Sequence, residues 1–201
     1  MNASEFVALL LLATASSFTP GPNTTLSTAL AANFGLKRAM HFVCAVPVGW
    51  GLLFSLCAAG LGSMVLAAPL LRWALLTGGI GYLLWLAFRL SGSRTLAQAD
   101  ASRLNVTFWQ GVLLQFLNVK AWMLALSIVA GWIAGQPDAT ARALRVLPVM
   151  LAFGFVSNLS YAMAGSLLRH WLTRGIRLLV FNRCMALALV LTAGWMLRSA
   201  L

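Results

Sequence analysis

Two clusters in this chain place polar groups inside apolar segments. The first is Pro20-Gly21-Pro22-Asn23, which interrupts an apolar run from Phe6 to Ala32. A proline inside a helix removes a backbone hydrogen bond and clashes with the preceding turn, which costs about 3 kcal/mol or more. It also disfavours helical dihedrals at the residue before it. Prolines on both sides of a glycine therefore predict that the helix unwinds here.

Such an unwound segment has the backbone chemistry to bind a zwitterion. Pro22 suits the first turn of a new helix, whose unpaired N–H groups and positive dipole end attract a carboxylate. Carbonyls from Ser16 to Phe18 lose their helical partners and can accept from an ammonium group. Unpaired backbone at membrane depth is tolerated where it is buried in protein or lines a wet cavity. We therefore expect Pro20, Gly21, Pro22 and Asn23 to form part of a substrate site.

The second cluster is Asn118-Val119-Lys120, near the middle of the apolar segment 108–133. A lysine at the centre of a membrane helix costs about 2.5–3.5 kcal/mol on insertion scales, and such residues usually face the bundle interior or an aqueous cavity. We expect Lys120 and Asn118 to donate to the same carboxylate. A lysine bound only to backbone carbonyls is the alternative. Gln115 and Asn158 lie at similar depth and suit either the site or hydrogen bonds between helices.

The composition predicts a membrane protein that holds these clusters on helices. Of 201 residues, 61% are hydrophobic and 8% are charged, so the chain cannot cover a soluble globule with polar surface. Its length allows about six helices of roughly 20 residues each with short loops. We expect a single all-α transmembrane domain over residues 1–201. The apolar runs predict spans at residues 5–32, 41–67, 70–90, 108–133, 143–168 and 177–198.

The polar connection from Ser91 to Asn105 divides the chain into residues 1–95 and 105–201, with three expected spans each. An odd number of spans inverts the second half relative to the first. Inverted three-span repeats are a common transporter architecture, with the substrate site at the midplane where interrupted helices meet. The predicted fold is therefore six transmembrane helices in two inverted three-helix repeats, with the first helix broken at Pro-Gly-Pro.

Basic residues near the span ends predict the orientation. They are concentrated after the first, third and fifth spans, and basic residues are retained in the cytoplasm, so both termini should face outward. The expected cytoplasmic side holds Lys37, Arg38, Arg89, Arg94, Arg103, Arg169, Arg174, Arg177 and Arg183, and the expected outer side holds Arg72, Arg142, Arg145 and Arg198.

Several functional classes are disfavoured by the residues present. The net charge of +11 is spread over loops rather than gathered on one face, so no nucleic-acid partner is expected. The acids Glu5, Asp100 and Asp138 lie at span ends or in loops and cannot form an intramembrane cage for a divalent metal ion. No Gly-rich phosphate loop or Ser-His-acid set is present. We expect no enzyme activity, metal or cofactor, and partners limited to a small-molecule substrate and the lipid bilayer.

Four motifs follow one another along the chain: Phe18-Thr19-Pro20-Gly21-Pro22-Asn23, Gly35-Leu36-Lys37-Arg38, Gly81-Tyr82-Leu83-Leu84-Trp85-Leu86 and Asn118 to Ala121. In this order they resemble the LysE/RhtB family of amino-acid exporters. That family commonly has Asn-Pro-Lys in the last motif, where this chain has Val119. The fourth span is therefore expected to be less broken than the first.

The stretch from Phe108 to Lys120, with Gly154 to Gly165 around Asn158, is most similar to the branch that exports cysteine and O-acetylserine. The resemblance implies a proton-coupled antiporter for small neutral amino acids in the bacterial inner membrane. An exporter of another small solute or drug, and a membrane subunit that transports nothing itself, remain as alternatives. A homodimer is also left open.

Overall fold

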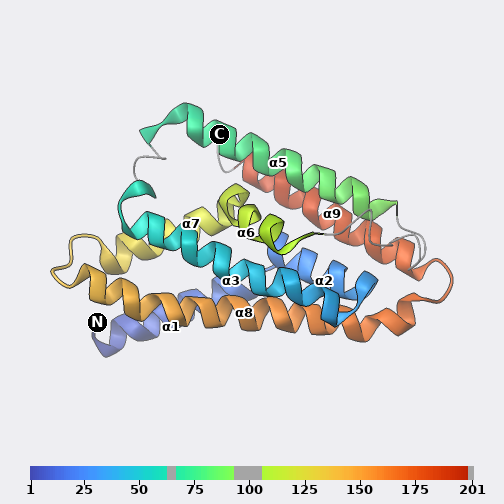
Figure 1. Ribbon diagram of the computed structural model, residues 1–201, viewed down its shortest axis with the longest axis horizontal. Helices are drawn as coiled ribbons and strands as arrows, with labels where there is room; N and C mark the ends of the chain where they lie inside the picture. Colours follow the sequence, from blue (N-terminus) through green and yellow to red (C-terminus); the bar gives the residue numbers. More distant parts are fainter. Residues whose placement is uncertain (63–66, 93–105, 199–201) are drawn as a thin grey trace.

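The computed structural model describes residues 1–62, 67–92 and 106–198, and this part of the chain is helical throughout (Figure 1). The expected connection from Ser91 to Asn105 lies almost entirely outside these ranges. The helices are α1 (Ala3–Phe18), α2 (Pro22–Phe34), α3 (Leu36–Ala58), α5 (Pro69–Ser91), α6 (Phe108–Leu117), α7 (Val119–Ile128), the π-helix η1 (Val129–Ile133), α8 (Ala139–Leu172) and α9 (Arg177–Arg198).

Four helices, α3, α5, α8 and α9, are each long and apolar enough to cross a membrane. Two further pairs pass the same test together: α1 with α2, bent by 49°, and α6 with α7 and η1, bent by 68°. The described residues thus hold up to six spans if each bent pair is one span. This confirms the prediction of an all-α membrane protein.

Most helix ends follow local sequence rules. The side chains of Asn2 and Thr107 accept hydrogen bonds from the third residue of α1 and α6 respectively, and a Glu or Gln there completes each capping box. Prolines occupy the first position of α2 and α5. The second expected span is shorter than predicted, because α3 ends at Ala58 and a turn through Gly60 at φ 90° follows.

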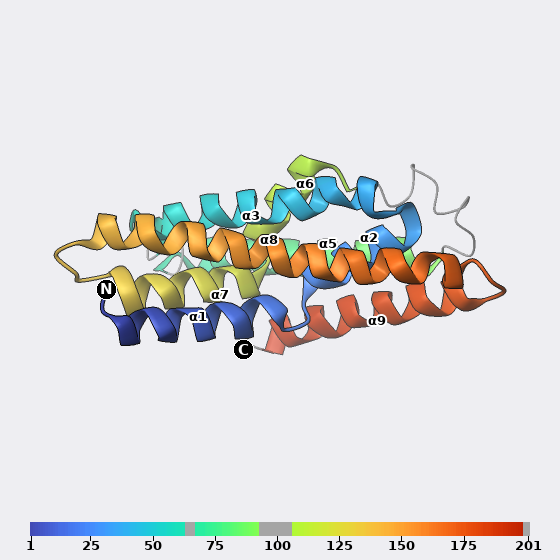
Figure 2. The same cartoon turned by 90° about the horizontal axis from the view of Figure 1, so that it is seen from below.

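The helices run along the long axis of the molecule in two groups. Helices α2, α3 and α8 pack against one another, with α6 against α3, while α5 and α9 form a pair along one side (Figures 1 and 2). Glycines allow the closest approaches: Gly165 of α8 lies against the Thr28 carbonyl of α2, and Gly49 of α3 lies against Val112 of α6. Small residues at such crossings are typical of membrane helices.

The buried apolar residues of the described chain form two large clusters and a small third one of Ala32, Leu172 and Leu178. One buried cluster includes Leu26, Phe42 and Leu83, from α2, the first half of α3, and α5. The other includes Leu9 and Phe54, from α1 and the second half of α3, together with residues of α7 and the first half of α8. Both bent pairs change direction between these clusters, so polar backbone lies at the middle of the bundle.

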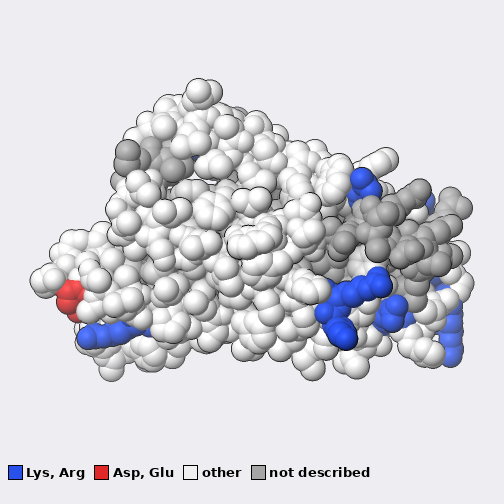
Figure 3. Space-filling model, viewed as in Figure 1, with Lys and Arg blue, Asp and Glu red and all other residues white. Residues whose placement is uncertain are grey.

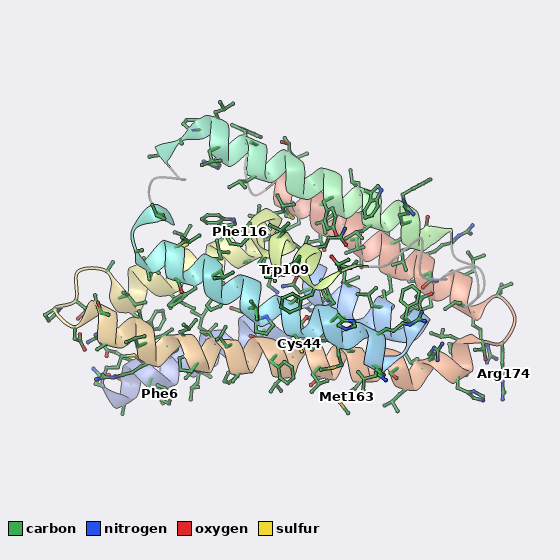
Figure 4. All side chains as sticks on the ribbon, in the orientation of Figure 1. Phe6, Cys44, Trp109, Phe116, Met163 and Arg174 are labelled. Atoms are coloured by element: carbon green, nitrogen blue, oxygen red, sulfur yellow. The ribbon has the colours of Figure 1, made fainter. Side chains whose placement is uncertain are left out.

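The two ends of the bundle differ in charge. At the end that carries the N-terminus, Arg142 of α8 contacts Asp138 at 2.7 Å and Glu5 of α1 at 3.3 Å. The hydrogen bond from Arg142 lowers the pKa of Asp138 below its usual value. On the face drawn in Figure 3, acidic atoms appear only at this end, and most basic atoms lie at the opposite end. Figure 4 places Phe6 at the N-terminal end and Arg174 at the opposite end.

Candidate substrate site at two helix breaks

A cavity of about 70 Å³ lies where the two bent pairs meet α3 and α8. Polar groups come mainly from the ends of α1, α2 and α7, and apolar groups mainly from α3, α7 and α8. The lining residues are Ser16, Ser17, Thr19, Gly21, Pro22, Asn23, Thr24, Val46, Pro47, Trp50, Asn118, Lys120, Ala121, Leu124, Met150, Gly154 and Asn158.

The first break leaves the carbonyls from Ser16 to Thr19 without helical partners, and side chains of the second half bind the last three. Ser157 Oγ donates to the Ser17 carbonyl at 2.5 Å. Tyr161 Oη donates to the Phe18 carbonyl at 3.0 Å. Lys120 Nζ donates to the Thr19 carbonyl at 2.8 Å. These contacts connect the unwound end of α1 to α7 and α8.

This arrangement changes the expectation for the ammonium group of a zwitterion. The carbonyls of Ser17 and Phe18 already accept from hydroxyl groups, so they are not simply vacant acceptors. The carbonyl of Ser16 also loses its helical donor, because residue 20 is a proline without an N–H. Ser16 lines the cavity. It is therefore a better placed acceptor than its two neighbours.

Lys120 lies beside the N-terminus of α2. Gly21 is the N-cap of α2, and its N–H donates to Thr24 Oγ1 at 3.0 Å. A Cβ at Gly21 would be in ordinary van der Waals contact with Lys120, 3.4 Å from Cδ and 3.5 Å from Nζ, so the lysine side chain lies directly beside this N-cap. The ammonium group and the positive end of α2 thus share one wall of the cavity, and both favour an anion. The backbone hydrogen bond to Thr19 also matches the alternative considered from the sequence, and the two roles are compatible.

The second break is a single residue, Asn118. Its φ of −95° and ψ of 101° end α6, and its side-chain oxygen accepts from the Lys120 backbone N–H at 3.1 Å to cap α7. The expectation of a less broken fourth span was wrong for the bend, which is 68° against 49° in the first pair. The expectation is correct for the length of the break. Only Asn118 separates α6 from α7, whereas Thr19 to Gly21 separate α1 from α2.

The other predicted site residues form polar pairs around the cavity. Asn23 and Gln115 exchange amide hydrogen bonds of 2.8 and 3.1 Å, which join α2 to α6. Asn158 accepts from Ser27 Oγ at 2.9 Å and joins α8 to α2. Asn23 and Asn158 also line the cavity, whereas Gln115 is buried behind Asn23. Pro20 is exposed and is not a lining residue.

Sequence reasoning missed the apolar part of the cavity. Val46, Pro47 and Trp50 of α3 contribute to it, as do Leu124 of α7 and Met150 of α8. Trp50 carried a usable signal, because it lies mid-span whereas tryptophan is enriched at membrane interfaces.

Two bent helix pairs that meet at a polar cavity inside an apolar helical bundle define a membrane transporter architecture. The family model for LysE type translocators matches residues 14–200, and the chain belongs to this family. It is 31% identical over 172 residues to the cysteine/O-acetylserine efflux protein of Klebsiella pneumoniae, covering 85% of this chain and 86% of that protein. It is 28% identical to the Escherichia coli K12 protein of the same name, over 76% of this chain and 77% of that protein. No solved structure matches the chain.

Proposed function

We propose that this protein is a secondary exporter of small neutral amino acids or close relatives, such as cysteine or O-acetylserine, across the bacterial inner membrane. The observation that carries the proposal is the cavity where Lys120, the N-terminus of α2 and freed α1 carbonyls converge. Membership of the LysE family and the names of the similar efflux proteins support the substrate class.

Each bent pair is proposed to be one broken span, so that the halves form inverted repeats. If the two halves exchange places by symmetry, α1 corresponds to α6, α2 to α7, α3 to α8 and α5 to α9. Part of the packing supports this exchange: α2 packs on α8 as α7 packs on α3, and α1 packs on α8 as α6 packs on α3. The same exchange turns the contact of α3 with α8 into itself, and likewise the contact of α5 with α9. The contacts of α5 with α6 and of α2 with α9 have no comparable counterpart among the described residues. Alternating access then moves the halves around a fixed central site.

Within this site, the substrate carboxylate binds Lys120 Nζ and the N-terminus of α2, with the Asn118 amide group as a further donor. The ammonium group binds the carbonyl of Ser16. No acidic residue is among those that line the cavity, which disfavours a cationic side chain. The small volume of about 70 Å³ disfavours a large one.

The basic end of the bundle is proposed to face the cytoplasm, which places both termini outside. Support comes from the distribution of charge, with acidic groups at the N-terminal end (Figure 3). Reporter fusions at each terminus test this orientation. A cytoplasmic N-terminus would reverse it.

Purified protein in lipid vesicles, supplied with labelled O-acetylserine, cysteine or serine, tests the proposal. We expect transport that a proton gradient accelerates, because the resemblance to the family implies proton coupling. Substrate transport that does not respond to the gradient would support export and contradict proton coupling. Vesicles that move drugs but not amino acids, or that move nothing without a partner protein, would favour the alternative functions.

Lys120→Met removes the proposed carboxylate donor, and we expect transport to fall about 100-fold or more, as misplacement of a bound substrate does in other sites. Lys37→Met is a matched control, because Lys37 begins α3 away from the cavity. Comparable insertion of both variants in the membrane shows that the loss is not one of folding. Undiminished transport by Lys120→Met would refute the site.

A further inference from the structure

The part of the cavity formed by α3 contains a buried hydrogen-bond donor without a partner. Trp50 lines the cavity, is 8% exposed and has an indole N–H for which the described residues supply no acceptor. Leaving a buried donor unsatisfied is costly, and native proteins rarely do so without a ligand, water or functional reason. The nitrogen atom itself has almost no accessible surface, so an acceptor from outside the chain reaches it when the side chains around it shift on binding.

Other tryptophans show that the chain can satisfy a half-buried indole. Trp122 Nε1 donates to the Phe116 carbonyl at 2.8 Å, and Trp132 Nε1 donates to the Glu5 carbonyl at 2.9 Å. Trp50 instead has its ring stacked on Phe54, with 5.2 Å between centroids. The stacking fixes the ring position without supplying an acceptor.

The neighbours of Trp50 in the cavity indicate which part of a substrate lies near it. The other residues that α3 contributes are Val46 and Pro47, and Leu124 and Met150 are the further apolar lining residues with large side chains. The charged groups of a zwitterion find their partners at the helix breaks instead. The substrate side chain is left to contact the apolar residues.

We infer that the Trp50 indole N–H donates a hydrogen bond to an oxygen or sulfur atom of the substrate side chain, and thereby selects small neutral amino acids that carry such an acceptor. This inference rests on the function proposed above. A site built to hydrogen-bond a substrate group discriminates strongly against an analogue that lacks it, because its own polar group is then left unpaired.

Transport of a matched substrate pair tests the selection. Serine and 2-aminobutyrate differ by a hydroxyl in place of a methyl group, so the ratio of their transport rates reports the side-chain hydrogen bond. We expect Trp50→Phe to lower the serine to 2-aminobutyrate ratio about tenfold, the effect of one hydrogen bond, while 2-aminobutyrate is still transported. Trp132→Phe is the control, because it removes an indole that already donates to the Glu5 carbonyl and does not line the cavity.

Equal losses for both substrates in Trp50→Phe would show a packing role and overturn the inference. Unchanged rates for both substrates would overturn it too, and would indicate that the indole does not contact the substrate. Vesicles of the unaltered protein separate these results from failure of the proposed function, since they must transport serine for the function to stand.

A spectroscopic measurement reads the same contact without transport. In protein labelled with ¹⁵N-tryptophan, the Trp50 indole signal is identified by its loss in Trp50→Phe. We expect serine and O-acetylserine to shift this signal downfield, and 2-aminobutyrate to leave it nearly unchanged. If vesicles transport serine but serine does not shift the Trp50 indole signal, the role of Trp50 is overturned and the exporter function stands.

Discussion

The two helix breaks reach the same cavity by different means. In the first, Pro20 and Pro22 remove two backbone donors, and Thr19 to Gly21 separate α1 from α2. In the second, no proline is present and Asn118 alone separates α6 from α7, yet the bend is larger, 68° against 49°. The larger of the two bends therefore forms without a proline.

The difference lies in what receives the freed backbone groups. At the first break, Ser157, Tyr161 and Lys120 from the other half bind the freed carbonyls. At the second, residues near the break do most of this: Trp122 Nε1 binds the Phe116 carbonyl, and the Asn118 N–H binds the Gln115 carbonyl at 3.3 Å. The first break thus joins the two halves, whereas the second is stabilised mostly within its own segment.

Replacing both prolines by alanine should have the largest effect on the difference between the two breaks. Pro20→Ala with Pro22→Ala restores two backbone donors and removes residues that each cost about 3 kcal/mol or more inside a continuous helix, and should allow α1 and α2 to form one helix. We expect transport to fall about 100-fold or more because the site geometry is lost, while thermal stability is retained or raised. Vesicle transport and unfolding in detergent measure the two effects.

Pro148→Ala is the control for this pair, because Pro148 lies inside the continuous helix α8, is exposed and does not line the cavity. It should transport nearly as well as the unaltered protein. Full transport by the double variant would mean that the prolines are not needed for the break.

The first break could be located from sequence because its cause is local. Two prolines around a glycine act on their own backbone whatever surrounds them. The second could not be described as well. The polar residues Asn118 and Lys120 marked its position, but the hydrogen bond of Trp122 to the Phe116 carbonyl and the close approach of α5 to Leu117 appear only in the folded structure.

Gly79 of α5 makes that close approach, and its substitution should affect the second break alone. A Cβ at Gly79 would meet the backbone carbonyl of Leu117. Because backbone cannot move aside as a side chain can, we expect Gly79→Ala to destabilise the protein by about 1–3 kcal/mol. The unfolding midpoint in detergent should fall by about 2–4 °C per kcal/mol.

Gly81→Ala is matched to this variant, since it lies on the same helix and an added Cβ there meets nothing within 4 Å. It should be neutral or slightly stabilising, as alanine favours helix over glycine. Equal unfolding midpoints for the two variants would show that the contact of α5 with Leu117 does not support the break.

A smaller effect is expected from the cap itself. Asn118→Ala removes the side-chain oxygen that accepts from the Lys120 N–H, and loss of an N-cap costs about 0.5–2 kcal/mol. Asn118→Ser keeps a capping oxygen and should recover most of that stability in the same unfolding measurement. If alanine and serine were equally destabilising, the role of Asn118 would lie outside capping.

Part of the cavity lining could be predicted from sequence, because some of its residues are unusual in a membrane helix. Gly21, Pro22, Asn23, Asn118, Lys120 and Asn158 were predicted and do line one cavity, because each is anomalous for a membrane helix. Val46 and Met150 are ordinary membrane residues, so nothing in their type distinguishes them from the lipid-facing surface. Ser157 and Tyr161 acquire their roles only through the α1 carbonyls that folding brings to them.

The smallest predicted effect comes from giving the second break a proline of its own. Val119 is the first residue of α7, where a backbone N–H is not needed for the helix. Asn118 already has extended dihedrals, which a following proline requires. Val119→Pro should therefore stabilise the protein by about 0.4–1 kcal/mol, through loss of freedom in the unfolded chain, without altering transport. A marked loss of either stability or transport would show that the second break must straighten during the cycle, and that its lack of proline is functional.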